Sequence, residues 1–134
     1  MVLWQKAQEL ALEVARLVAV LPKDAMASVL GRQLIASAAS VGANIAEGCG
    51  RYAAGAYRNH LSIARGSTCE TDGWLHLLRK SGYIDEETEF KLPGLCEELV
   101  KLLTTRMIGL DKQRKSVGRI REDSPLYQLD EAFE

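Results

Sequence analysis

Two glutamates set among small and polar residues are the first candidates for chemistry. Glu47 follows Asn44 in a stretch rich in Ala, Ser and Gly, and Glu70 follows Ser67. Paired carboxylates act as general acid and base, or bind metals in helical bundles through a Glu-x-x-His motif. Neither glutamate has a histidine three residues later, and His76 lies six residues after Glu70. A hydrolytic or metal site at these carboxylates is therefore kept only as an alternative.

Arginines close to the same positions favour a structural role for these glutamates. A carboxylate among apolar neighbours needs a charge partner, and the arginine guanidinium offers a bidentate one. We therefore predict a hydrogen-bonded network that locks the connection between the second and third helices onto the bundle. Its predicted members are Asn44, Glu47, Arg51, Arg65, Ser67 and Glu70.

Other reactive residue types do not form a recognisable site. At 100° per residue, His60 and His76 face directions roughly 160° apart on one helix. The Gly48-x-Gly50 pair has no preceding strand and no following Lys-Ser or Lys-Thr, so it is not a phosphate loop. The odd number of cysteines and the absence of a CxxC pair favour reduced, structural thiols: Cys49, Cys69 and Cys96. We expect no catalytic residues, metal or cofactor, and no enzymatic activity.

A row of arginines is the candidate surface for nucleic acid. Arg51, Arg58 and Arg65 recur every seven residues, a spacing that drifts only about 20° per step on a helix. Phosphate groups are the partners that such a row would contact. In the alternative interpretation, Arg51 and Arg65 pair with Glu47 and Glu70, and Arg58 alone faces solvent. Five more basic residues that can add to the row follow near the C-terminus: Lys112, Arg114, Lys115, Arg119 and Arg121.

The charge balance limits but does not exclude such binding. The 134 residues include 17 Lys and Arg against 18 Asp and Glu, a formal net charge of −1. This excludes a uniformly basic nucleic-acid coat, yet residues 112–121 hold five basic and no acidic groups, and 122–134 hold five acidic and no basic ones. Aromatic residues make up 6% of the chain, too few for a platform on which single strands stack.

Four segments repeat apolar residues with a period near 3.6, which is typical of amphipathic helices. Pro22 separates the first from the second, and Asp24 offers the second an N-cap. The third should run from about Ala53 to Ser81, with Gly82 suited to its C-cap. Asp85 is placed to cap the fourth. With short connections and no strand, the pattern predicts an all-α, up-down-up-down four-helix bundle.

Three residues complicate these helices. Gly66 and Gly73 lie inside the third helix, where each costs about 1 kcal/mol relative to alanine, and we expect close packing to compensate. Pro93 either kinks the fourth helix or moves its start to about Lys91. The third helix also carries two apolar stripes, which predicts a second packing partner and a homo-oligomer.

The chain divides into a bundle domain, residues 1–111, and a charged C-terminal tail, residues 112–134. The tail is either solvated or docks its large apolar side chains, Leu126, Tyr127, Leu129 and Phe133, on a neighbour. The N-terminal apolar run is broken by polar residues, and no stretch of about 20 apolar residues follows. We therefore expect a cytoplasmic protein with no membrane partner.

Several strings of residues together resemble a known family. They are Trp4-Gln5-Lys6-Ala7, Gln33, the run from Ser40 to Arg51, Tyr57 with Leu61, Ile63 to Ser67 with Glu70, and Gly82-Tyr83-Ile84. Over roughly residues 2–110 the chain resembles the bacterial four-helix bundle family encoded in intervening sequences of 23S ribosomal RNA genes. Asn-Ile-Ala-Glu-Gly followed by Ala-Arg-Gly-Ser is the most specific part of this resemblance.

The resemblance implies a bundle that assembles into a ring, typically a pentamer, and it brings no enzymatic activity. A related branch is the accessory protein of diversity-generating retroelements, a basic pentamer that binds nucleic acid and partners a reverse transcriptase. Many members carry a basic pair two and three positions after the glutamine, where this chain has Ile35 and Ala36. The leading hypothesis is a non-enzymatic oligomeric scaffold or adaptor, and the alternative is a nucleic-acid-binding accessory protein for RNA or DNA.

Overall fold

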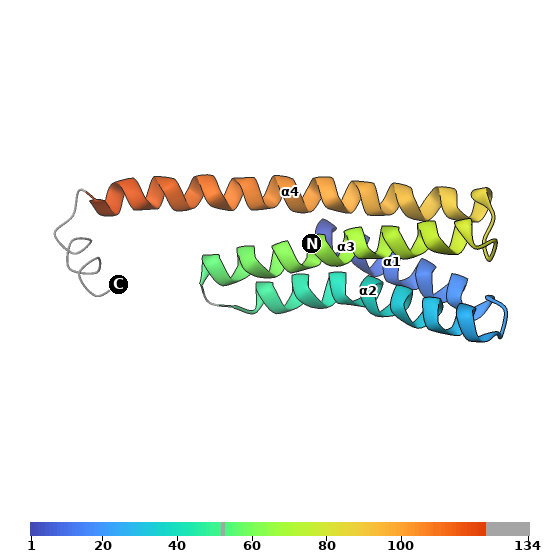
Figure 1. The fold of residues 1–134 in the computed structure, drawn as a ribbon. Helices are drawn as coiled ribbons and strands as arrows, with labels where there is room; N and C mark the ends of the chain where they lie inside the picture. Colours follow the sequence, from blue (N-terminus) through green and yellow to red (C-terminus); the bar gives the residue numbers. More distant parts are fainter. Residues whose placement is uncertain (52, 123–134) are drawn as a thin grey trace.

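The computed structural model of the chain describes residues 1–51 and 53–122, with the side chains of 88–90 and 117–122 excepted. It contains four helices within these residues: α1 (Val2–Ala19), α2 (Ala25–Cys49), α3 (Ala54–Lys80) and α4 (Glu86–Glu122). Successive helices run in opposite directions and are joined by short connections (Figure 1). The predicted all-α, up-down-up-down bundle is confirmed.

Each helix packs against two neighbours, so the four form a closed ring around one core. The contacting pairs are α1 with α2, α2 with α3, α3 with α4, and α4 with α1. The α2–α3 interface is the most extensive and the α1–α4 interface the least. The core side chains recur with the helical period expected from the sequence, and the largest of those fully buried are Leu10, Leu34, Ile45, Leu61, Leu75, Leu78, Leu99 and Leu103.

Two local signals in the sequence fix helix ends as predicted. The Asp24 side chain accepts a hydrogen bond from the Ala27 amide at 2.8 Å and so caps α2. Gly82 has a φ of +80°, a left-handed conformation that costs glycine little. Its amide and that of Tyr83 donate to the Arg79 and Leu78 carbonyls, the paired bonds of a Schellman motif.

The fourth helix differs from the expectation at both ends. It begins at Glu86 and contains Pro93, so a start near Lys91 is wrong. Acidic residues in the first turn interact favourably with the helix dipole, whereas an internal proline removes one backbone hydrogen bond. The helix also continues to Glu122, so residues 112–122, which we assigned to the tail, are helical. Basic residues near a helix C-terminus favour this continuation. The rest of the predicted tail lies outside the described residues.

Glycines allow close approach in α2, not in α3 as expected. A Cβ at Gly66 or Gly73 would meet no atom of the described residues within 4 Å, so the expected close packing at these two glycines is not found in the described part of the chain. A Cβ at Gly31 would lie 3.3 Å from Val18, and one at Gly48 only 2.8 Å from the His60 Cβ. The close approach at Gly48 brings the end of α2 against the start of α3.

None of the helices in the described part of the chain combines the length and apolar character that crossing a membrane requires.

Candidate functional site: a polar seam between α2 and α3

Six polar residues face one another across the antiparallel α2–α3 pair, and we call them the polar seam. Those on α2 are spaced three and four residues apart, which places them on one helix face: Ser37, Ser40 and Asn44. Those on α3 are spaced seven and four apart: His60, Ser67 and Thr71. Because α2 and α3 are antiparallel and joined by a short connection, residues that lie equally far before and after this connection in the sequence face each other.

The inner end of the seam is fully enclosed by the bundle. Thr71 is completely buried and Ser37 is 4% exposed. The Thr71 hydroxyl donates to the Ser37 oxygen at 2.9 Å, and the Ser37 hydroxyl donates to the Leu34 carbonyl at 2.9 Å. Thr71 Oγ1 also lies 2.8 Å from the Ser67 carbonyl oxygen. Both hydroxyls are therefore satisfied, as buried polar groups must be to avoid a desolvation penalty.

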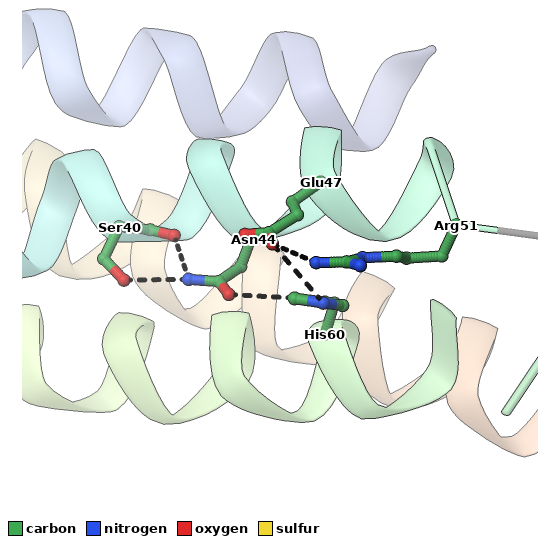
Figure 2. Close-up of polar contacts among 5 residues, drawn as sticks. All are labelled: Ser40, Asn44, Glu47, Arg51 and His60. Atoms are coloured by element: carbon green, nitrogen blue, oxygen red, sulfur yellow. Dashed lines mark hydrogen bonds and ion pairs between the residues drawn. The ribbon is translucent and has the colours of Figure 1, made fainter. Parts of the chain in front are cut away.

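The middle of the seam joins the two helices through a pair of serines. Ser40 Oγ and Ser67 Oγ are 2.9 Å apart. The Asn44 side-chain amide donates to the Ser40 carbonyl oxygen at 2.9 Å and lies 3.0 Å from Ser40 Oγ, as Figure 2 shows. This amide thereby orients the serine pair.

At its outer end the seam reaches a histidine and an exposed ion pair. His60 Nδ1 lies 3.2 Å from Asn44 Oδ1. Since the Asn44 nitrogen donates to Ser40, its oxygen is the acceptor, and the hydrogen-bond network places a proton on His60 Nδ1. The other ring nitrogen, Nε2, lies 4.0 Å from Glu47 Oε1 (Figure 2). Arg51 donates to the same Glu47 oxygen.

The seam has the hydrogen-bond pattern of a clamp between helices. A nucleophilic hydroxyl needs a base within hydrogen-bonding distance. The hydroxyls of Ser40 and Ser67 contact each other, and His60 contacts Asn44 and approaches Glu47. The side chains of the polar seam therefore fix the register of α3 against α2.

The structure joins only some of the residues predicted to form a network. Asn44 and Ser67 belong to the seam, and Glu47 pairs with Arg51 at its outer end. Both partners of that pair are about half exposed, 53% and 52%, so the pair contributes little to stability.

Glu70 and Arg65 lie outside the seam and do not pair with each other. The Glu70 carboxylate accepts a hydrogen bond from the Trp74 indole at 3.2 Å. Arg65 is exposed and forms no hydrogen bond or ion pair with the described residues. Both belong to the outward side of α3, where solvent satisfies charged groups at no cost.

Sequence reasoning missed four members of the seam: Ser37, Ser40, His60 and Thr71. Their signal was the spacing of small polar residues on the inner faces of two adjacent helices. Recognising it requires the register of the α2–α3 pair, which Gly48 sets through its contact with His60.

The predicted row of three arginines is divided by the structure. Arg51 precedes α3, which begins at Ala54. Arg58 forms a bidentate pair with Asp111 of α4, with Nε–Oδ1 and Nη2–Oδ2 distances of 3.0 and 3.3 Å. This hydrogen bonding raises the pKa of Arg58 and lowers the pKa of Asp111. Arg58 thus holds α3 to α4, where we had considered a phosphate contact or a solvated side chain.

The basic residues of α4 lie beyond this ion pair. Lys112, Arg114 and Lys115 are exposed, and Arg114 Nη1 lies 4.0 Å from where a Cβ of Gly55 would be, beside the first turn of α3. The side chains of Arg119 and Arg121 fall outside the described ones. At the positions where many family members carry a basic pair, Ile35 and Ala36 are exposed and uncharged.

Neither the carboxylates nor the thiols come together in a metal site. Within residues 1–51 and 53–122, no three His, Cys, Asp or Glu side chains form a group that could hold a metal ion. Glu47 and Glu70 contact different partners. All three cysteines are free, and burial, with Asp72 and Cys69 nearby, raises the pKa of Cys96 to about 12. Cys96 is therefore a neutral core thiol.

Fold and seam together define a small all-α bundle protein in which the polar residues between α2 and α3 hold these two helices in register. The model of the 23S rRNA-intervening sequence protein family matches residues 1–105, and the chain belongs to this family. A solved structure of a protein of unknown function from the S23 ribosomal protein family of Bacteroides thetaiotaomicron is 30% identical, with a TM-score of 0.74. The similarity covers 78% of this chain and 97% of that one. No curated protein matches the chain.

Proposed function

We propose that this protein is a non-enzymatic, oligomeric helical scaffold or adaptor of the cytoplasm. The observation that carries the proposal is the outward face of α3. It keeps Ile63 and Leu77 at 44% and 42% exposure, although α3 already packs against α2 and α4. Gly66 and Gly73 lie between them with open space above their backbones, which leaves room for another helix to approach closely.

The engagement of polar residues in the bundle supports a non-enzymatic role. The seam hydroxyls bond to one another and to backbone carbonyls, and Arg58 bonds to Asp111. A second copy of the chain is the natural partner for the apolar face, and the family resemblance implies a ring of five.

The mass of the protein in solution tests this proposal. We expect light scattering and native mass spectrometry to report an oligomer that the double variant Ile63→Glu, Leu77→Glu reduces to single chains with unchanged helicity. Val20→Glu is the matched control, because Val20 is 78% exposed at the far end of α1. A strict monomer at micromolar concentration would contradict the proposal.

A second candidate function, a nucleic-acid-binding accessory protein, is favoured by the start of α3. Its N-cap, Ala53, provides no side-chain hydrogen bond, and its first turn has no acidic residue. Free amides at a helix N-terminus attract phosphate, and Arg114 lies beside this turn. By resemblance, a reverse transcriptase is the partner that such a protein would serve.

Fluorescence anisotropy with labelled RNA and duplex DNA tests the second function. If phosphates bind here, affinity falls steeply with added salt. We expect Arg114→Glu with Lys115→Glu to abolish binding and Lys23→Glu, an exposed control in the α1–α2 connection, to leave it unchanged. Absence of binding at low ionic strength would exclude this function.

A further inference from the structure

An apolar groove of about 480 Å³ lies where α1 begins. Its walls are Val2 and Leu3 of α1, Tyr57 of α3, and Leu102 and Arg106 of α4. Val2 is 63% exposed at this groove. The groove is therefore apolar surface that a further segment of polypeptide can cover.

The groove lies where α1 begins, at a point that α4 passes by several turns. At 1.5 Å per residue, the 18 residues of α1 span about 27 Å, whereas the 37 residues of α4 span about 55 Å. Figure 1 shows α1 starting beside the middle of α4, so α4 continues well past it. Beyond the start of α1, the described part of the bundle consists of α2, α3 and α4 alone.

One basic side chain, Arg106, lines the groove, and others lie farther along α4. Arg106 is exposed, and its guanidinium carbon lies 5.7 Å from the centre of the Tyr57 ring. The exposed Lys112, Arg114 and Lys115 follow on α4, whereas the nearby Arg58 is already paired. An occupant that combines apolar side chains with acidic groups matches this lining and these basic side chains.

The chain itself contains such a segment directly after α4. Residues 123–134, which lie outside the described residues, include Leu126, Tyr127, Leu129 and Phe133, together with four acidic and no basic groups. A Ser-Pro pair, Ser124-Pro125, favours a turn at its start. The segment is thus complementary to the groove in both polarity and charge.

The length of this segment fits a return to the groove of its own chain. Arg106 and Glu122 are separated by about 24 Å along α4. The eight residues from Leu126 to Phe133 span up to about 27 Å when extended. A reversal at Ser124-Pro125 therefore brings Phe133 level with Arg106.

We propose that residues 123–134 fold back along α4 and seat Phe133 in the groove between α1, α3 and α4 of the same chain. The acidic groups of the segment then lie along the basic side chains of α4. This contact is independent of the scaffold function, because it lies at the start of α1 and not on the outward face of α3.

Fluorine NMR on the full chain tests the proposal. The chain has only two phenylalanines, Phe90 and Phe133, so 4-fluorophenylalanine gives two signals, and Phe133→Leu identifies one of them. We expect a soluble gadolinium chelate to relax the Phe133 signal several-fold less in the native protein than in urea. Val2→Glu should raise this relaxation to the urea level, and Val20→Glu, an exposed valine at the other end of α1, should not change it.

A second variant guards against an indirect effect of Val2→Glu on the fold. Arg106→Glu replaces an exposed side chain and should also expose Phe133, as should added salt. Equal relaxation of Phe133 in the native protein and in urea would overturn the proposal. So would protection that survives both variants. If the protection of Phe133 disappeared on dilution, the groove would be occupied by the C-terminal segment of a second copy. That result would also overturn the proposal.

Discussion

The Tyr83 hydroxyl donates a hydrogen bond to Asp24 Oδ1 at 3.1 Å, and the same oxygen accepts the Ala27 amide at 2.8 Å. One carboxylate oxygen therefore caps α2 and holds the turn between α3 and α4. Burial of Tyr83 and its bond to Asp24 both raise the pKa of the phenol. This end of the bundle is closed by a contact between two connections that are far apart in the sequence.

Replacing Asp24 should weaken both connections together. We expect Asp24→Ala to lower the free energy of unfolding by about 1–2 kcal/mol, since an N-cap is typically worth that much. Tyr83→Phe, which removes only the second bond, should cost about 0.5–1 kcal/mol. Urea denaturation measures both, and an Asp24→Ala cost smaller than that of Tyr83→Phe would contradict the shared role.

Gly48 is the helix position where alanine should destabilise the protein. Glycine to alanine inside a helix normally stabilises by about 1 kcal/mol. At Gly48, however, the added Cβ would lie 2.8 Å from His60 Cβ and 3.4 Å from the Tyr57 carbonyl oxygen. We expect a net loss of about 1–3 kcal/mol in thermal or urea unfolding.

Gly66→Ala and Gly73→Ala are the matched controls, because no atom of the described residues lies within 4 Å of the added methyl group. Both should stabilise the protein by up to about 1 kcal/mol when measured in the single-chain Ile63→Glu, Leu77→Glu background, where no second copy packs on these glycines. If Gly48→Ala behaved as these two do, α2 and α3 would not approach as closely as the structure shows.

The buried Thr71–Ser37 bond should be measurable by a double-mutant cycle. Thr71→Val keeps the shape of the side chain and removes its hydroxyl, at an expected cost of about 0.5–1.5 kcal/mol. Ser37→Ala should cost a similar amount, and the double variant less than the sum, because the two share one bond. Thr105→Val, at an exposed position, is the control. Additive losses would show that the two hydroxyls act independently.

The Arg58–Asp111 pair should make stability depend on acid pH. Because the folded state lowers the pKa of Asp111, the pair stabilises above the unfolded pKa of about 4 and loses its effect as pH falls through the folded value. We expect unmodified protein to exceed Asp111→Asn in stability at neutral pH, with the difference vanishing well below pH 4. The effect is small, since the two side chains are 38% and 45% exposed and solvent screens the pair. A difference independent of pH would contradict this assignment.

The first three helices and two of the predicted caps could be predicted because their signals are local. Asp24 precedes an apolar repeat, and Gly82 follows one, so each end depends on the few residues around it. The third helix was expected from about Ala53 to Ser81 and runs Ala54–Lys80. Apolar periodicity likewise identified the buried face of every helix.

The polar contacts could not be predicted because they depend on register between helices. The pairing of His60 with Asn44 follows from the close approach at Gly48, which no local pattern reveals. Arg58 and Asp111 are 53 residues apart, so the partner of Arg58 was out of reach of a search for nearby charges. The seven-residue spacing predicted that the three arginines share one helix face, but it could not predict which residues they contact.

The part of α4 beyond Asp111 is an outer arm of the bundle. Before that residue the helix is held by buried side chains, including Leu99 and Leu103, and by the Arg58–Asp111 ion pair. From Asp111 to Glu122 the helix continues for about 16 Å. Lys112, Arg114 and Lys115 lie on this arm, so a bend there moves three basic side chains while the core of α4 stays in place.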